Sequence, residues 1–164
     1  MNAREAIKTS LQSTQGMLAS FIGDLSDADL LVRPVPGANH IAWQLGHLID
    51  AEAGFFGKMT PGYVAPEMPA GFSEQHGKAT ASVEPAKGFC TKQQYLDLFN
   101  KARAATIAAV DKMSDADLDK PTPSDFAKMA PTIGALLLMT SSHTMMHAGQ
   151  FTVLRRKLGK PILF

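Results

Sequence analysis

The chain has 164 residues, of which 45% are hydrophobic and 19% are charged, and its formal net charge is +1. This balance excludes an intrinsically disordered protein. The basic residues are neither in excess nor strongly clustered, which argues against nucleic-acid binding. A single domain covering residues 1–164 is expected, because this length is sufficient to bury a substantial core.

The compartment is predicted from three features. Cys90 is the single cysteine, so no internal disulfide bond can form, which fits a reducing compartment. The first residues, Met1–Glu5, lack the apolar stretch of a secretory signal peptide. No apolar run approaches the roughly 20 residues that a membrane-spanning helix needs. We therefore expect a cytoplasmic protein that does not enter a membrane.

Four long helices are expected, and no segment has a convincing strand pattern. The first covers roughly residues 3–22, where hydrophobic side chains recur at helical spacing. The second begins near Asn39, a favourable N-cap residue, and extends to about Phe56. Gly57 then stands where a helix commonly ends in a glycine.

The third and fourth helices follow in the second half of the chain. The third opens with Thr91–Gln94, which matches a capping box, and continues to about Met113. The fourth begins after Thr132 and continues to Leu158, a length of about 39 Å at 1.5 Å per residue. The basic run Arg155–Lys157 lies in its last turn, where cations stabilise the helix dipole, so a capping role is expected for it.

A five-residue motif occurs twice in equivalent places. Residues Ser26–Leu30 and Ser114–Leu118 both read Ser-Asp-Ala-Asp-Leu, and each follows a long helix and precedes a proline-containing loop and another helix. Chance recurrence of a common helix-start motif is one explanation. Duplication of a helix pair is the other, and it predicts an all-α four-helix bundle with approximate internal twofold symmetry.

The connection between the second and third helices, residues 57–90, is long and has no sustained periodicity. Such an insert is usually functional or mobile, although the need to cross from one helix pair to the other could alone explain its length. Tyr63, Phe72, Glu74 and His76 are expected to help it cover one end of the bundle.

Three histidines carry the strongest functional signal. His143 and His147 are four residues apart on the inward face of the fourth helix, which places their Cβ atoms about 6 Å apart. A lone histidine in an apolar helix is ordinarily a core residue, but two adjacent buried imidazoles need partners, and a shared metal ion provides one. With His47 from the second helix they would leave one coordination position free, as in catalytic sites. Thr144 replaces the glutamate of the metalloprotease motif, so peptide hydrolysis by that route is disfavoured.

Four further residues are candidates for the pocket or for contacts with the metal ligands. His40 lies roughly 10 Å from His47 along the helix axis, so we expect it to cap the helix or to line the pocket mouth. Trp43 shares the face of His47 and is expected in the core or the pocket wall. Asp50 and Gln150 could hydrogen-bond the imidazoles and fix their tautomers, or could face solvent.

Sulfur-containing side chains are assigned lesser roles. Met139, Met145 and Met146 are expected to be adaptable packing residues rather than metal ligands. Cys90 is expected to be a bystander at the start of the third helix. A reactive thiol there is the alternative, because a helix N-terminus lowers the pKa of a thiol.

The segments Asn39–Leu48, His143–Gln150 and Leu154–Gly159 resemble the DinB-like superfamily, which includes YfiT-like and mycothiol-dependent relatives. The resemblance covers essentially the whole chain. It implies a four-helix bundle with a long second-to-third connection and a metal triad formed by His47, His143 and His147. Many relatives have an arginine where this chain has Ala148, so any role of that arginine is absent here.

Two functions remain open at this point. The resemblance implies a divalent-metal-dependent enzyme, with zinc or nickel as the ion and a small-molecule substrate. In that case a low-molecular-weight thiol would serve a transferase or isomerase reaction, or a related hydrolase would use water. The alternative is a non-enzymatic, metal-binding or structural, stress-associated helical module that acts as a homodimer or through another partner.

Overall fold

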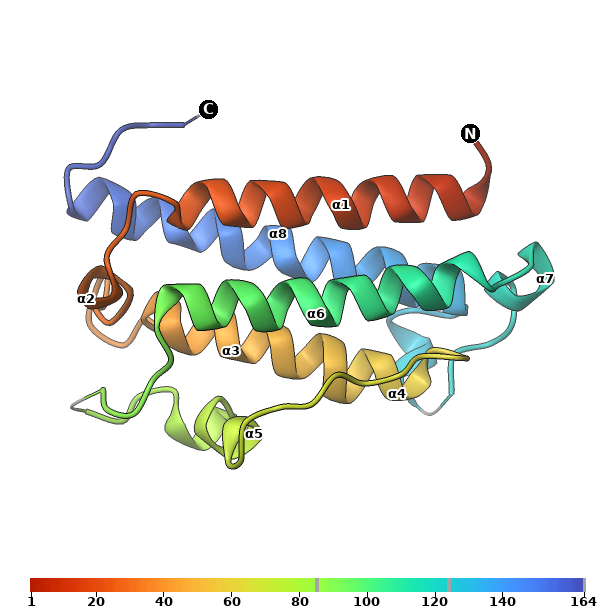
Figure 1. Ribbon diagram of the computed structural model, residues 1–164, viewed down its shortest axis with the longest axis horizontal. Coiled ribbons are helices and arrows are strands. Elements are labelled where there is room, and N and C mark those ends of the chain that lie inside the picture. The colour runs from red at the N-terminus through yellow and green to blue at the C-terminus, as the bar shows by residue number, and fades with distance from the viewer. Residues whose placement is uncertain (85, 124, 164) are drawn as a thin grey trace.

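The computed structural model describes residues 1–84, 86–123 and 125–163. In these residues all regular structure is helical, and β pairing is limited to one isolated bridge between Pro121 and Thr132. The predicted four-helix bundle is confirmed (Figure 1). Its long elements are α1 (Ala3–Ile22), α3 (Ile41–Asp50) continued by η1 (Ala51–Phe56) and α4 (Gly57–Met59), α6 (Lys92–Asp111), and α8 (Ile133–Lys157).

Helices α1 and α8 lie side by side and run in the same direction. Ser10 hydrogen-bonds Ser141 at 2.7 Å, and Arg155, about four turns further along α8, donates to the Phe21 carbonyl near the end of α1 at 2.9 Å. Helix α6 runs parallel to α3, because the connection from α4 returns along the bundle before α6 begins (Figure 1). The long connection therefore has a topological cause, and α3 and α8 face each other as antiparallel neighbours.

The second long helix differs from its prediction at both ends. His40, not Asn39, is its N-cap, and the His40 side chain accepts a hydrogen bond from the Trp43 amide. Gly57 does not end the helix, which continues to Met59 through the π-helical segment η1. A Cβ atom on Gly57 would lie 2.5 Å from Cε1 of Tyr63, so the glycine makes room for that ring instead.

The two Ser-Asp-Ala-Asp-Leu copies adopt the same local structure. They form α2 (Asp27–Leu30) and α7 (Asp115–Leu118), and the N-cap residues Ser26 and Ser114 have nearly identical backbone angles and complete the same capping box. The two short helices lie at opposite ends of the bundle (Figure 1), as approximate twofold symmetry requires. The duplicated pattern thus has a structural counterpart.

The connection contains α5 (Phe72–Gln75) and η2 (Lys78–Thr80) and packs on the outside of α3. Phe72 and His76 are buried, whereas Glu74 is exposed. His76 lies so close to α3 that a Cβ atom on Gly46 would be 2.0 Å from its Cδ2 atom. The His76 ring also lies within hydrogen-bond distance of the Phe72 carbonyl and of the Tyr95 hydroxyl on α6.

A buried ion pair occupies the centre of the bundle. Arg103 on α6 donates to both carboxylate oxygens of Glu52, with the shortest contacts at 2.9 Å, and neither side chain is more than 3% exposed. Thr106 donates to the same carboxylate, and Arg103 also donates to Thr144 on α8 and to the Leu11 carbonyl on α1. All four long helical stretches are joined by this network.

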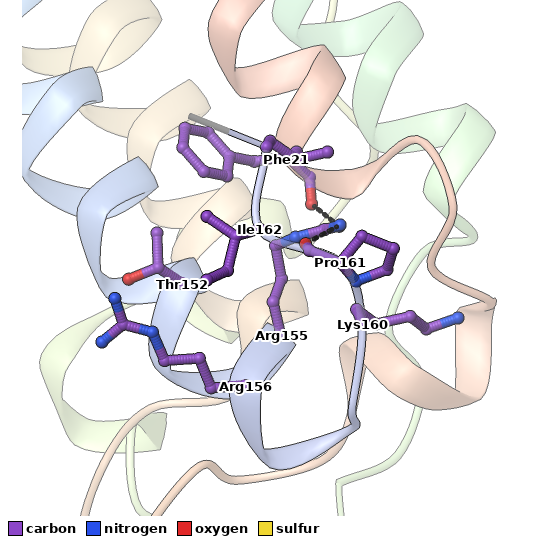
Figure 2. Close-up of a pocket in the computed structure, with 8 residues that line it drawn as sticks. Phe21, Thr152, Arg155, Arg156, Lys160, Pro161 and Ile162 are labelled. Carbon is purple, nitrogen blue, oxygen red and sulfur yellow. Dashed lines mark hydrogen bonds between the residues drawn. The ribbon is translucent and has the colours of Figure 1, made fainter.

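The basic run lies in the last turn of α8, as predicted, but its first residue has a further role. Arg155 is buried and donates to the Phe21 and Pro161 carbonyls (Figure 2). It also pairs with Asp24. Its charge therefore lies at the C-terminus of α1 rather than capping its own helix. Arg155 also lines a cavity of about 180 Å³, and residues of the C-terminal segment form part of the same wall.

Within the described residues, no helix combines the length and apolar character needed to cross a bilayer.

Candidate metal centre

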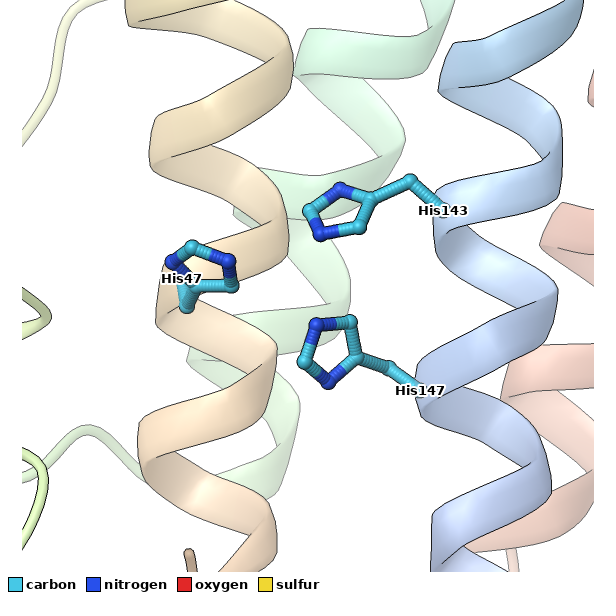
Figure 3. A group of neighbouring side chains, drawn as sticks. All are labelled: His47, His143 and His147. Atoms are coloured by element: carbon cyan, nitrogen blue, oxygen red, sulfur yellow. The ribbon is translucent and has the colours of Figure 1, made fainter.

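His47, His143 and His147 converge between α3 and α8 (Figure 3). One ligand atom from each ring lies within 4.8 Å of the others, and the ring centroids are 4.9 to 5.3 Å apart. His143 and His147 come from successive turns of one helix, and His47 faces them from the antiparallel neighbour. The three rings converge because each residue lies on the inward face of its helix and the two helices are adjacent.

The orientation of His47 is set by Trp43, one turn earlier on α3. The indole and imidazole rings are stacked, with centroids 5.0 Å apart and planes within 6°. The indole Nε1 in turn donates to the Gly77 carbonyl and to the Thr80 hydroxyl, each at 3.3 Å. The long connection therefore positions Trp43, and Trp43 positions the His47 ring.

The orientation of His147 is set by Gln44, a buried residue that the sequence analysis did not single out. Nδ1 of His147 lies 2.8 Å from Oε1 of Gln44. The amide orientation is itself fixed, because Nε2 of Gln44 donates to the Asn39 carbonyl at 2.9 Å. Nδ1 of His147 must then carry the proton, which leaves its Nε2 atom as the lone-pair donor.

All three histidines are held in the neutral form near pH 7. Burial lowers the pKa of His143 to about 4, with the neighbouring His47 adding to the effect. Burial and the two neighbouring rings lower the pKa of His147 to about 3. Burial also lowers the pKa of His47, partly offset by the charge of Asp50. Neutral imidazoles have free lone pairs, so the cluster is ready to bind a cation.

These residues fit a divalent ion. Two nitrogen ligands of one tetrahedral zinc ion lie about 3.4 Å apart, given Zn–N distances of about 2.05 Å. The observed separations of at most 4.8 Å require only small rotations of the rings to reach this geometry. Imidazole suits both zinc and nickel, and three ligands leave a coordination position free.

The open side of the cluster faces a cavity of about 630 Å³. His47 and His143 contribute to its wall, while the buried His147 lies behind them. This volume is within the range of small-molecule sites, about 300–1,000 Å³. The other lining residues are Asp50, Ala51, Phe55, Phe56, Phe126, Met129, Met139, Ser142 and Met146.

The four additional candidate residues have different locations. His40 caps α3, as one of its two predicted roles required, and is not part of the cluster. Trp43 is buried against His47, and Asp50 lines the cavity. Gln150 is exposed on α8, so the partner of His147 is Gln44 and not Gln150. Gln44 could have been noticed from its sequence, because it is three residues before His47 on the same apolar helix face.

The structure also shows where the long connection and the sulfur-containing residues lie. His76 lies on the outer side of α3 and outside the metal cluster. Met139 and Met146 line the cavity. Cys90 is half-buried, and burial raises the pKa of its thiol, which disfavours the reactive-thiol alternative.

A model of the DinB superfamily matches residues 10–151 of the chain. Two solved structures are similar to it. A conserved protein from Enterococcus faecalis has a TM-score of 0.66 and 16% identity, covering 98% of this chain and 99% of that one. YfiT from Bacillus subtilis, described as a probable metal-dependent hydrolase with an unusual four-helix bundle topology, has a TM-score of 0.67 and 15% identity, covering 96% of this chain and 89% of that one. At these identities the likeness shows the fold. No curated protein sequence matches the chain.

Proposed function

The chain belongs to the DinB superfamily, and from this premise we propose that it is a divalent-metal-dependent enzyme that brings a low-molecular-weight thiol to an electrophilic small molecule, in a transfer or isomerisation reaction. The observation that carries the proposal is the convergence of three neutral imidazoles on one side of a small-molecule-sized cavity. A buried structural histidine cluster has no need of such an opening.

A zinc or nickel ion held by His47, His143 and His147 would supply Lewis acidity, which lowers the pKa of a thiol or a water molecule at the open position. The protein contributes fixed geometry, because Trp43 and Gln44 orient two of the three rings before any ligand binds. Asp50, which lines the cavity, is our candidate acceptor for the proton that the thiol or water would release. Its Oδ1 atom accepts a hydrogen bond from Ser73, which leaves Oδ2 for this role.

Hydrolysis is the second candidate, and one specific observation favours it. YfiT, which shares the fold, is described as a probable metal-dependent hydrolase. Water would then take the place of the thiol, while the same histidines and the same cavity would serve the reaction. The two candidates differ in a single reactant, so one set of assays separates them.

The test uses protein loaded separately with zinc and with nickel. Conjugation of 1-chloro-2,4-dinitrobenzene is measured with glutathione, bacillithiol and mycothiol, and hydrolysis of 4-nitrophenyl acetate is measured without thiol. Thiol-dependent turnover that a chelator abolishes supports the first candidate, and thiol-independent ester hydrolysis that a chelator abolishes supports the second.

The variants His143→Ala and His147→Ala should lose either activity, while Thr140→Val, which removes a buried hydroxyl elsewhere on α8, should retain it. Turnover that survives both histidine substitutions would overturn the proposal. Full metal occupancy without any turnover would instead favour the non-enzymatic module, and analytical ultracentrifugation would then establish whether the protein is the expected homodimer.

A further inference from the structure

The wall of the metal-facing cavity is aromatic as far as one of the histidines. Phe55 packs against Phe56 and Phe126, with ring centroids 5.4 and 4.9 Å apart. Phe56 packs in turn against the ring of His143, at 5.9 Å. Three methionines, Met129, Met139 and Met146, complete the apolar surface. A group bound at the histidines would therefore lie directly beside aromatic rings.

Charged side chains contribute little to this cavity. Among the described residues that line it, Asp50 is the only acidic one, and lysine and arginine are absent. Apart from the histidines, Asp50 and Ser142, every described lining residue is apolar. A substituent that lies against these apolar residues would gain free energy from burial rather than from charge.

We infer that the substrate of this site is a small molecule with an aryl or branched-alkyl group next to its reactive atom. This inference rests on the proposed function. The aromatic wall formed by Phe55, Phe56 and Phe126 binds the apolar group, which gains free energy by leaving water.

Hydroxamates provide the test, because their chelating group binds a histidine-held metal while the remainder reports on the cavity. Dissociation constants of acetohydroxamate and benzohydroxamate are measured by calorimetry on the zinc-loaded protein. Benzohydroxamate should bind roughly 10- to 100-fold more tightly than acetohydroxamate, as expected for burial of a phenyl ring.

Two substitutions assign the effects to their residues. Phe55→Ala should reduce the ratio of benzohydroxamate to acetohydroxamate affinity to within about 3-fold, because it removes the central ring of the wall. Met145→Ala, which shortens an exposed apolar side chain of α8 outside the cavity, should leave the ratio as it is.

The outcomes separate this inference from the proposed function. Equal affinity for acetohydroxamate and benzohydroxamate would overturn the inferred substrate class and leave the metal centre intact. Failure of every probe to bind, acetohydroxamate included, would overturn the proposed metal centre and this inference with it.

Discussion

Two groups of polar side chains inside the same bundle differ in how completely their hydrogen-bonding atoms are paired. In the Glu52–Arg103 network, the carboxylate and guanidinium bond each other and also reach threonines and a backbone carbonyl. In the histidine cluster, hydrogen bonding fixes one ring, through Gln44, and two of the three rings open into a cavity. The ion pair has its hydrogen-bond partners within the protein, whereas the histidine cluster is arranged to bind a ligand.

The difference shows how to distinguish structural from functional polarity in a core. A buried charge without partners costs several kcal/mol, so a complete set of partners is what a purely structural pair requires. A cluster that leaves lone pairs directed at an open cavity gains nothing for folding from that arrangement. The chemistry of this protein is therefore expected at the histidines and not at the ion pair. The following substitutions test that division.

The largest expected effect is on folding. Arg103→Met leaves the Glu52 carboxylate buried without its cation, which should lower the free energy of unfolding by about 3–5 kcal/mol. Urea denaturation measures the change. The matched control is Lys8→Met, which breaks the more exposed pair with Asp111 and should cost less than about 1 kcal/mol. The double variant Glu52→Gln/Arg103→Met should recover most of the loss. Similar costs for Arg103→Met and Lys8→Met would contradict the closed network.

The next effect is on metal affinity. His143→Ala removes one of the three proposed ligands, so zinc affinity should fall by about 100-fold or more, beyond the 10- to 100-fold typical of groups that only orient a ligand. Because the His143 ring is only partly buried, the metal-free variant should unfold within about 1 kcal/mol of the parent. Competition with a chromogenic chelator and urea denaturation give the two quantities. A large loss of stability with unchanged zinc affinity would mean that His143 has a structural role and not a metal-binding one.

A smaller effect is expected at Gln44. Gln44→Leu removes the acceptor that fixes the His147 tautomer, and zinc affinity should fall about 10- to 100-fold. Gln44→Glu keeps an acceptor at that position and should retain affinity within about 3-fold. The ¹⁵N shifts of the His147 ring in the metal-free protein should report Nδ1 protonation in the parent and a mixed population in Gln44→Leu. Identical tautomers in both proteins would refute this role.

The smallest effect concerns His40, a buried histidine outside both groups. Burial, with a contribution from Arg33, lowers its pKa to about 4. The unfolded chain takes up a proton below about pH 6.5, so the stability that His40 contributes is present above that pH and is lost as the pH falls toward 4. His40→Asn keeps an N-cap acceptor and should reduce the stability lost between pH 7 and pH 5 by roughly 1–2 kcal/mol. The same pH dependence of stability in the parent and in His40→Asn, measured by urea denaturation, would argue against this contribution of His40.

The features predictable from sequence were those encoded by local spacing. Helical periodicity predicted four long helices, and the capping boxes at Ser26, Thr91 and Ser114 form as expected. The pairing of His143 with His147 follows from their separation of four residues. His47 could be added because it lies on the inward face of another helix, and the fold brings it to the pair.

The features that escaped prediction depend on contacts between distant segments. Glu52 and Arg103 are 51 residues apart, and neither spacing nor composition indicates that they pair. The docking of the connection depends on His76 packing over Gly46, which only the folded geometry reveals. The assignment of Asn39 as the N-cap was wrong by one residue, because the adjacent His40 can also accept the capping hydrogen bond.

The stacking of Trp43 on His47 has a practical consequence. Trp43 is the only tryptophan in the chain, and its indole lies 5.0 Å from the imidazole of a proposed metal ligand. Intrinsic fluorescence therefore originates beside the centre itself, and no dye is needed to follow its occupancy. Paramagnetic nickel should quench this fluorescence more strongly than zinc does, so the emission of this one side chain would report metal exchange.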